Sequence, residues 1–100
     1  MKQVEILDKA LEDLAKGEDF YERQQPGLGA YFSNSILSDA ASLSTRHGFH
    51  AKRYGFHWLL ASKFPFGIYY RESDLAIVVY AVLDQRSRPA SIRRLLNKRK

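Results

Sequence analysis

The hydrophobic pattern changes its period along the chain, and each change marks a predicted element. Residues 2–7 alternate between apolar and polar, with Val4 and Ile6 on one side, as in a strand with one buried face. Asp8 is then suited to cap a helix beginning at Lys9, because its carboxylate can accept hydrogen bonds from the free amides of the first turn. The apolar positions of this helix are Leu7, Leu11, Leu14 and Tyr21.

A break at residues 25–29 separates this helix from a second helical pattern. Pro26 and the Gly27-Leu28-Gly29 sequence disfavour a continuous helix, so two helices joined by a short turn are predicted. The apolar positions of the second helix are Leu28, Phe32, Ile36, Ala40 and Leu43. A Gly-x-Gly sequence can also bind phosphate, but no strand precedes this one and no Lys-Ser/Thr pair follows it. We therefore interpret it as the turn of a helical hairpin.

The second half of the chain has the period of two that is typical of strands. Three strands are predicted, over residues 56–61, 64–71 and 75–83. The connector at residues 72–74 is short enough for a hairpin, so we expect an antiparallel meander.

Two prolines refine this prediction. Pro65 requires a sheet edge or a bulge, because proline has no amide hydrogen to donate. Pro89 can occupy the first position of a short C-terminal helix, and the tail at residues 97–100 is expected to fray. The apolar positions of this last helix are Ile92, Leu95 and Leu96. The order of elements predicts an α+β fold in a single domain spanning residues 1–100.

Charge divides the chain into two unequal parts. Residues 1–45 contain four basic and eight acidic side chains, a net charge of −4. Residues 46–100 contain twelve basic and three acidic side chains, a net charge of +9. This imbalance favours a binding surface for a negatively charged macromolecule over an ordinary solvated face. The basic residues predicted to contact such a target are Lys52, Arg53, Lys63, Arg71, Arg86 and Arg88.

Few side chains suggest catalytic or metal chemistry. The chain has no cysteine, which excludes disulfides, thiolate zinc sites and a cysteine nucleophile. His47 and His50 have no carboxylate close in sequence and are interpreted as loop residues. His57 should point away from the strand face that carries Trp58, and packing is favoured over proton transfer. We therefore expect neither a metal nor a small-molecule cofactor.

Targeting signals are not evident in the sequence. The first residues do not form the apolar run of a signal peptide, and no apolar stretch approaches the about 20 residues that a membrane helix needs. We expect a cytoplasmic protein that does not associate with membranes.

Two segments carry a resemblance to a known family. The residues Phe64-Pro65-Phe66-Gly67-Ile68-Tyr69-Tyr70-Arg71 and the stretch from Ile77 to Pro89 resemble the RelE/ParE toxin superfamily, and the match covers nearly the whole chain. The resemblance implies the toxin of a bacterial type II toxin–antitoxin pair. Its cognate partner would be an acidic antitoxin that wraps the helical hairpin or the open sheet. The antitoxin-binding residues are not assigned.

The resemblance leaves the target open. RelE-like toxins cut messenger RNA in the ribosomal A site, and Arg86 matches the arginine that they carry after the last strand. In such a ribonuclease His57 and Arg86 would be the catalytic residues. Gly67 stands where these nucleases tend to carry arginine, and neither tyrosine nor histidine follows Pro89. We therefore favour the ParE-like branch, whose members inhibit DNA gyrase without catalysis, and a non-toxic binding module is a further alternative.

Overall fold

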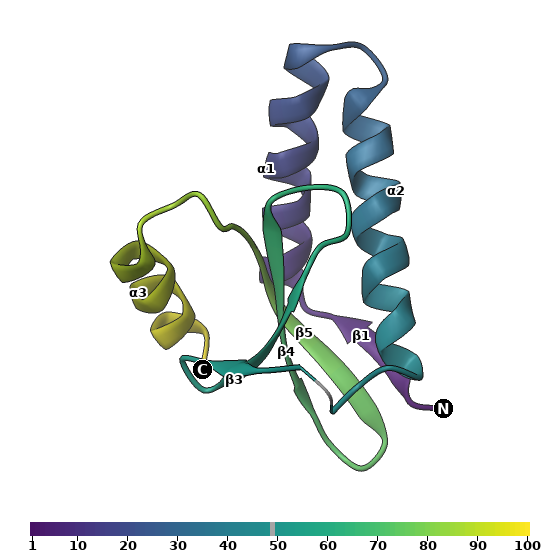
Figure 1. Ribbon diagram of the computed structural model, residues 1–100, viewed down its shortest axis with the longest axis vertical. Coiled ribbons are helices and arrows are strands. Elements are labelled where there is room, and N and C mark those ends of the chain that lie inside the picture. The colour runs from purple at the N-terminus through teal and green to yellow at the C-terminus, as the bar shows by residue number, and fades with distance from the viewer. Residues whose placement is uncertain (49) are drawn as a thin grey trace.

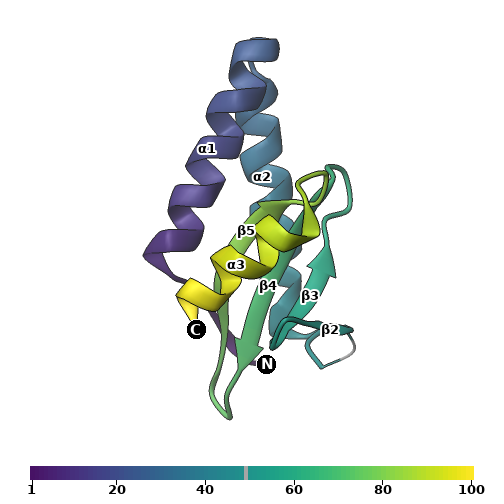
Figure 2. The ribbon, with the colours of Figure 1, turned by 90° about the vertical axis from the view of Figure 1, so that its left-hand side faces the viewer.

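The computed structural model describes residues 1–48 and 50–100. A five-stranded sheet lies between a hairpin of two helices on one face and a shorter helix on the other (Figures 1 and 2). The elements are β1 (Gln3–Ile6), α1 (Asp8–Gln24), α2 (Leu28–Ala41), the 3₁₀ turn η1 (Ser42–Ser44), β2 (Lys52–Arg53), β3 (Phe56–Leu60), β4 (Phe66–Glu72), β5 (Ala76–Asp84) and α3 (Pro89–Arg99). The predicted α+β class and order of elements are confirmed.

The sheet is mixed and has the strand order β1-β5-β4-β3-β2. β1 is parallel to β5, and the other neighbouring strands are antiparallel, so the predicted meander is confirmed as β3, β4 and β5. The first strand of the chain, β1, therefore lies beside the last strand, β5. None of the helices in the described residues is both long enough and apolar enough to cross a membrane.

α1 and α2 form the predicted hairpin, which extends well beyond the sheet (Figure 1). Gly27 has a φ of +90° at the turn, a conformation that glycine adopts at little steric cost. The Glu22 carboxylate accepts hydrogen bonds from the amides of Gly27 and Gly29, both at 3.0 Å. These amides are therefore already bound to an anionic side chain, which supports the interpretation of the Gly-x-Gly sequence as a turn.

The start of α1 differs from the prediction. Asp8 is the first residue of the helix, and Leu7, whose side chain cannot accept a hydrogen bond, occupies the cap position. The Leu7 amide instead donates to the carbonyl of Val79, so the chain passes directly from β1 into α1. Leu7 and Leu11 are exposed as a result, and they do not belong to the core. The buried face of α1 consists of Ala10, Asp13, Leu14, Gly17 and Tyr21.

Alternation along the strands divides the buried apolar side chains between two cores. The core beneath the hairpin includes Phe32, Ile36, Ile68, Tyr70, Ile77 and Val79. The core beneath α3 includes Phe56, Tyr69, Ala81, Ile92 and Leu96. Tyr69 and Tyr70 therefore lie on opposite faces of β4, as a period of two requires.

β2 is an edge strand that the hydrophobic pattern did not predict. Arg53 pairs with Phe56 across a two-residue turn formed by Tyr54 and Gly55. Both turn residues have positive φ, 55° for Tyr54 and 86° for Gly55, as a type I′ turn requires. Tyrosine is uncommon in this conformation, so the sequence lacks the usual Asn-Gly signal for such a turn.

Pro65 lies in the tight turn that precedes β4. The amide of Phe66 donates to the carbonyl of Phe64, and the Pro65 carbonyl accepts from the Gln85 amide, both at 2.8 Å. The register shift between β4 and β5 occurs between Tyr69 and Tyr70, away from the proline. The turn, rather than a bulge, therefore accommodates Pro65, and β4 begins two residues later than predicted.

The tail that was expected to fray is helical, because α3 continues to Arg99. The Arg99 guanidinium donates to Asp13 through Nη2 and Oδ1 at 2.8 Å and to the Tyr80 carbonyl at 3.1 Å. Oδ2 of Asp13 also accepts from the Val82 amide at 3.0 Å. This buried ion pair joins α1, β5 and α3, and it accounts for the order of the last turn.

Candidate functional site

The six basic residues predicted to meet a target do not form one surface. The pairing of the strands places them at opposite ends of the sheet. Lys52, Arg53 and Arg71 lie at the end that carries the β2–β3 turn, whereas Lys63, Arg86 and Arg88 lie at the end where β5 leads into α3.

At the β2–β3 end the arginines rest on aromatic rings. The Arg53 guanidinium lies 3.8 Å from the ring centre of Trp58, and that of Arg71 lies 4.3 Å from the ring centre of Phe56. Nε of Arg71 also donates to the carbonyl of Gly55 at 3.3 Å. Contacts of this kind contribute about 0.5–1 kcal/mol at exposed sites, and they hold the charged groups in place.

At the other end the charge of Arg86 is offset by an acid. The Arg86 guanidinium donates to both oxygens of Asp84, at 3.0 and 2.8 Å. This hydrogen bonding raises the pKa of Arg86 and lowers the pKa of Asp84. Lys63 lies with Nζ 5.2 Å from the ring centre of Tyr31, and Arg88 is exposed just before α3. This end is therefore a weaker attractor of anions than its number of basic residues suggests.

The structure does not bring together His57 and Arg86, the residues predicted to act in a ribonuclease. His57 on β3 pairs with Tyr70 on β4, which in turn pairs with Val79 on β5. Asp84, which binds Arg86, lies five residues further along β5. A strand rises about 3.3 Å per residue, so these positions are about 15 Å apart or more. One phosphodiester could not contact both side chains.

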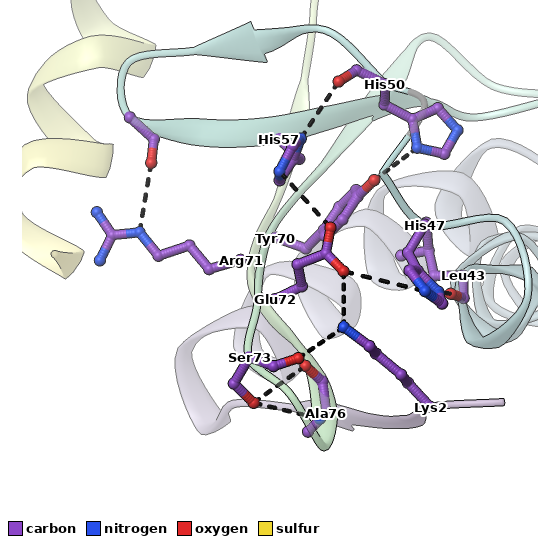
Figure 3. Close-up of polar contacts among 11 residues, drawn as sticks. Lys2, Leu43, His47, His50, His57, Tyr70, Arg71, Glu72, Ser73 and Ala76 are labelled. Atoms are coloured by element: carbon purple, nitrogen blue, oxygen red, sulfur yellow. Dashed lines mark hydrogen bonds and ion pairs between the residues drawn. The ribbon is translucent and has the colours of Figure 1, made fainter.

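A polar cluster around Glu72 was not predicted from the sequence (Figure 3). Its carboxylate lies 2.9 Å from Nζ of Lys2 and 4.0 Å from Nε2 of both His47 and His57. The hydrogen bond from Lys2 is the main cause that lowers the pKa of Glu72. His57 thus points away from Trp58, as predicted, but toward an acid.

The other two side chains of this cluster are His50 and Tyr70. Nδ1 of His50 lies 2.6 Å from the Tyr70 hydroxyl, and the ring of His57 stacks on that of Tyr70 with centroids 5.2 Å apart. Burial, followed by the proximity of His57, lowers the pKa of His50, and burial raises the pKa of Tyr70. The cluster depends on the pairing of His57 with Tyr70, which appears only when β3 and β4 are aligned.

An open cavity of about 220 Å³ lies between the polar cluster around Glu72 and the β2–β3 turn. Its lining residues are Lys52, Gly55, His57, Arg71 and Glu72. Three of the predicted residues, two cations and a histidine, share this space. Among residues 1–48 and 50–100, no group of three potential ligands is arranged to hold a metal ion.

Gly67 is enclosed by side chains on the α3 side of the sheet. Nε1 of Trp58 donates to Oε1 of Gln85 at 3.1 Å directly over this position. A Cβ atom at Gly67 would lie 2.7 Å from Nε2 of Gln85. The arginine that RelE-like nucleases tend to carry here would therefore collide with this pair.

A groove of about 330 Å³ lies between α1 and α3, above β5. It is mainly apolar, and Phe20 on its border is 47% exposed. The lining residues are Asp13, Lys16, Gly17, Phe20, Phe66, Val82, Leu83, Asp84 and Leu95. The lining residues come from four elements that are far apart in the sequence, so the hydrophobic pattern did not predict this surface.

Comparisons with known proteins identify the fold. No protein-family model and no curated protein matches the chain. A solved structure of the chromosomal ParDE TA system from P. aeruginosa contains a chain that is 21% identical in sequence. The similarity covers 82% of this chain and 94% of that chain, with a TM-score of 0.72. The protein therefore has a ParE-like fold, as the sequence resemblance implied.

Proposed function

We propose that this chain is the toxin of a type II toxin–antitoxin pair and that it acts in the cytoplasm by inhibiting DNA gyrase. The similarity to a chain of a ParDE system, which covers most of both chains, supports the assignment to such a pair. The choice of gyrase rests on the resemblance to the ParE branch and on one structural observation, the separation of His57 from Arg86 by most of a strand.

This separation matters because cleavage and binding make different demands. RNA cleavage needs a base at the 2′-hydroxyl and a cation at the same phosphate, both within hydrogen-bonding reach. Here the histidine faces Glu72, and Arg86 is bound to Asp84 at the other end of the sheet. Inhibition by binding needs only a complementary surface, which the two basic ends can supply.

Pulse labelling of cells tests the target. DNA and protein synthesis are followed in the first minutes after the chain is induced without an antitoxin, with a copy that carries a stop codon at Lys9 as control. We expect DNA synthesis to fall first. Earlier loss of protein synthesis would overturn the choice of gyrase, and harmless induction would favour a non-toxic binding module.

We place the cognate antitoxin in the groove between α1 and α3. The groove offers apolar area beside the exposed ring of Phe20, and Lys16 provides a cation for an acidic chain. Phe20→Asp should abolish rescue by the co-expressed antitoxin and leave toxicity intact. Leu75→Asp is the matched control, because Leu75 is 84% exposed and lies in the β4–β5 turn. Full rescue of Phe20→Asp would refute this placement.

Messenger RNA cleavage on the ribosome is the second candidate. The observation in its favour is the cavity that His57 shares with Lys52 and Arg71. If this candidate is correct, translated messages are cut by the wild type and by His47→Gln but not by His57→Gln. We expect instead that none of the three proteins cuts them.

A further inference from the structure

Arg71 and Lys100 meet at the β2–β3 turn, and Arg53 lies next to this turn at the end of β2; these three basic residues are called the hairpin cation cluster. A Cβ atom at Gly55 would lie 3.3 Å from Nζ of Lys100 and 3.7 Å from Nη2 of Arg71. Both charged groups therefore lie against the same point of the turn. Figure 1 shows the C-terminal end of α3 beside this turn.

No ion pair in the described part of the chain joins the cluster to an acidic side chain. Ion pairs there involve Arg23, Arg86 and Arg99, but none includes Arg53, Arg71 or Lys100. The adjacent Glu72 lines the same cavity as Arg71, but its carboxylate accepts a hydrogen bond from Lys2, and Figure 3 shows it pointing away from the Arg71 guanidinium. The like charges of Arg71 and Lys100 lie against the same turn and repel one another, so a bound anion would stabilise the cluster.

The two arginines are held in position before any partner arrives. Trp58 supports the Arg53 guanidinium, and Phe56 with the Gly55 carbonyl supports that of Arg71. A planar guanidinium that is already oriented loses less conformational entropy on binding than a free side chain does. This arrangement suits a ligand with closely spaced, strongly anionic groups.

The surface that the cluster presents is charged rather than apolar. The guanidinium groups cover the rings beneath them, and Phe56 is only 1% exposed. The cores of protein–protein interfaces are depleted in charged residues, whereas interfaces with nucleic acids are polar and strongly positive. The cluster therefore matches a phosphate backbone better than a protein surface.

We propose that the hairpin cation cluster binds the phosphate backbone of duplex DNA. Guanidinium and ammonium groups donate charge-assisted hydrogen bonds to phosphate oxygens. The choice of duplex DNA rests on the proposed function, because gyrase acts on duplex DNA and the toxin would contact the DNA that the enzyme holds. Binding through three cations alone is independent of sequence and sensitive to salt.

Fluorescence anisotropy with a short labelled duplex tests this proposal across a series of salt concentrations. The test protein is Arg53→Gln/Lys100→Gln, and the control is Lys9→Gln/Arg23→Gln. Both double variants remove two exposed cations, but Lys9 and Arg23 lie on α1 in ion pairs with Glu12 and Asp19. The slope of log affinity against log salt should fall by about 0.9 for each cluster cation removed, and the control slope should match the wild type.

Several outcomes would overturn the proposal. These are failure of the wild type to bind the duplex, an equal loss in both variants, and tighter binding to single-stranded RNA or to polyglutamate than to duplex DNA. Thermal unfolding of each variant checks that the fold is intact. A supercoiling assay separates the proposed DNA contact from the proposed gyrase target. If the protein inhibits gyrase but does not bind the duplex, only the DNA contact is refuted. If it binds the duplex but does not inhibit gyrase, only the gyrase target is refuted.

Discussion

The last two residues of the chain belong to two different regions of the molecule. Arg99 is largely buried against Asp13, where it joins α3 to α1 and β5. Lys100 is exposed beside Gly55, in the hairpin cation cluster. Both residues are basic and adjacent, yet only Arg99 faces an acid. The role of a basic residue here therefore depends on which groups its charged end contacts in the fold.

The same distinction applies to the basic half of the chain as a whole. Arg86 was predicted to contact a target, but Asp84 offsets its charge. Arg53 and Arg71 rest on rings and keep their charges available. A count of basic residues therefore overstates the attraction of anions to the β5–α3 end. It also gives no sign that the arginine side chains at the β2–β3 end are held in place by aromatic rings.

Arg99→Ala should have the largest effect and tests the structural side of the comparison. The Asp13 side chain, 8% exposed, would lose its cation, and removing one partner of a buried ion pair costs about 3–5 kcal/mol. Urea unfolding should show a loss of that size. Lys100→Ala is the control, and it should change the free energy of unfolding by no more than about 0.5 kcal/mol. Equal losses of unfolding free energy in the two variants would contradict the different roles assigned to Arg99 and Lys100.

Gly55→Ala should have an intermediate effect and tests the geometry of the cluster. Gly55 has a φ of +86°, and an L residue in this region costs about 1–2 kcal/mol. The new methyl group would also press on Lys100, so DNA affinity should fall with stability. Gly48→Ala is a matched control, because Gly48 has a φ of +84° and its Cβ would meet Glu72 instead. The control should lose stability but keep its DNA affinity, and a parallel loss of affinity would contradict the assignment.

The smallest expected effect concerns pH and the cluster around Glu72. The pKa of His50 is lowered from 6.5, so its stabilising contribution is complete above that pH and is lost as pH falls through the lower folded value. The pKa of Glu72 is lowered from 4.5, so its contribution is lost in the same direction at more acidic pH. Urea unfolding should therefore give a lower free energy at pH 5 than at pH 7. His50→Asn should reduce the dependence of the unfolding free energy on pH between pH 5 and 7. An unchanged dependence would refute the contribution of His50 to it.

Local sequence signals were sufficient for most of the architecture. The turn at Gly27, the period of two along β4 and the proline at the start of α3 each act through neighbouring residues, and each prediction is confirmed. The β2–β3 turn was missed because Tyr54 adopts a positive φ that its residue type rarely does. The cap at Asp8 was wrong because a backbone hydrogen bond from Leu7 to β5 sets the start of α1.

The site was harder to predict because its contacts join residues that are distant in sequence. Asp13 and Arg99 are 86 positions apart, and Lys2 and Glu72 are 70 apart. The Arg53 guanidinium rests on the ring of Trp58, and this contact exists because β2, a strand that was not predicted, pairs with β3. The basic residues are evident in the sequence, but which of them face an acid depends on the fold.

A supercoiling assay with purified gyrase tests the central claim most directly. Relaxed plasmid, gyrase and ATP are incubated with increasing amounts of the toxin, and Arg99→Ala serves as the destabilised control. We expect the wild-type protein to inhibit supercoiling in proportion to its occupancy of the enzyme and to leave translated messages intact. Full supercoiling in the presence of excess folded toxin, together with cleavage of messages on the ribosome, would contradict the account.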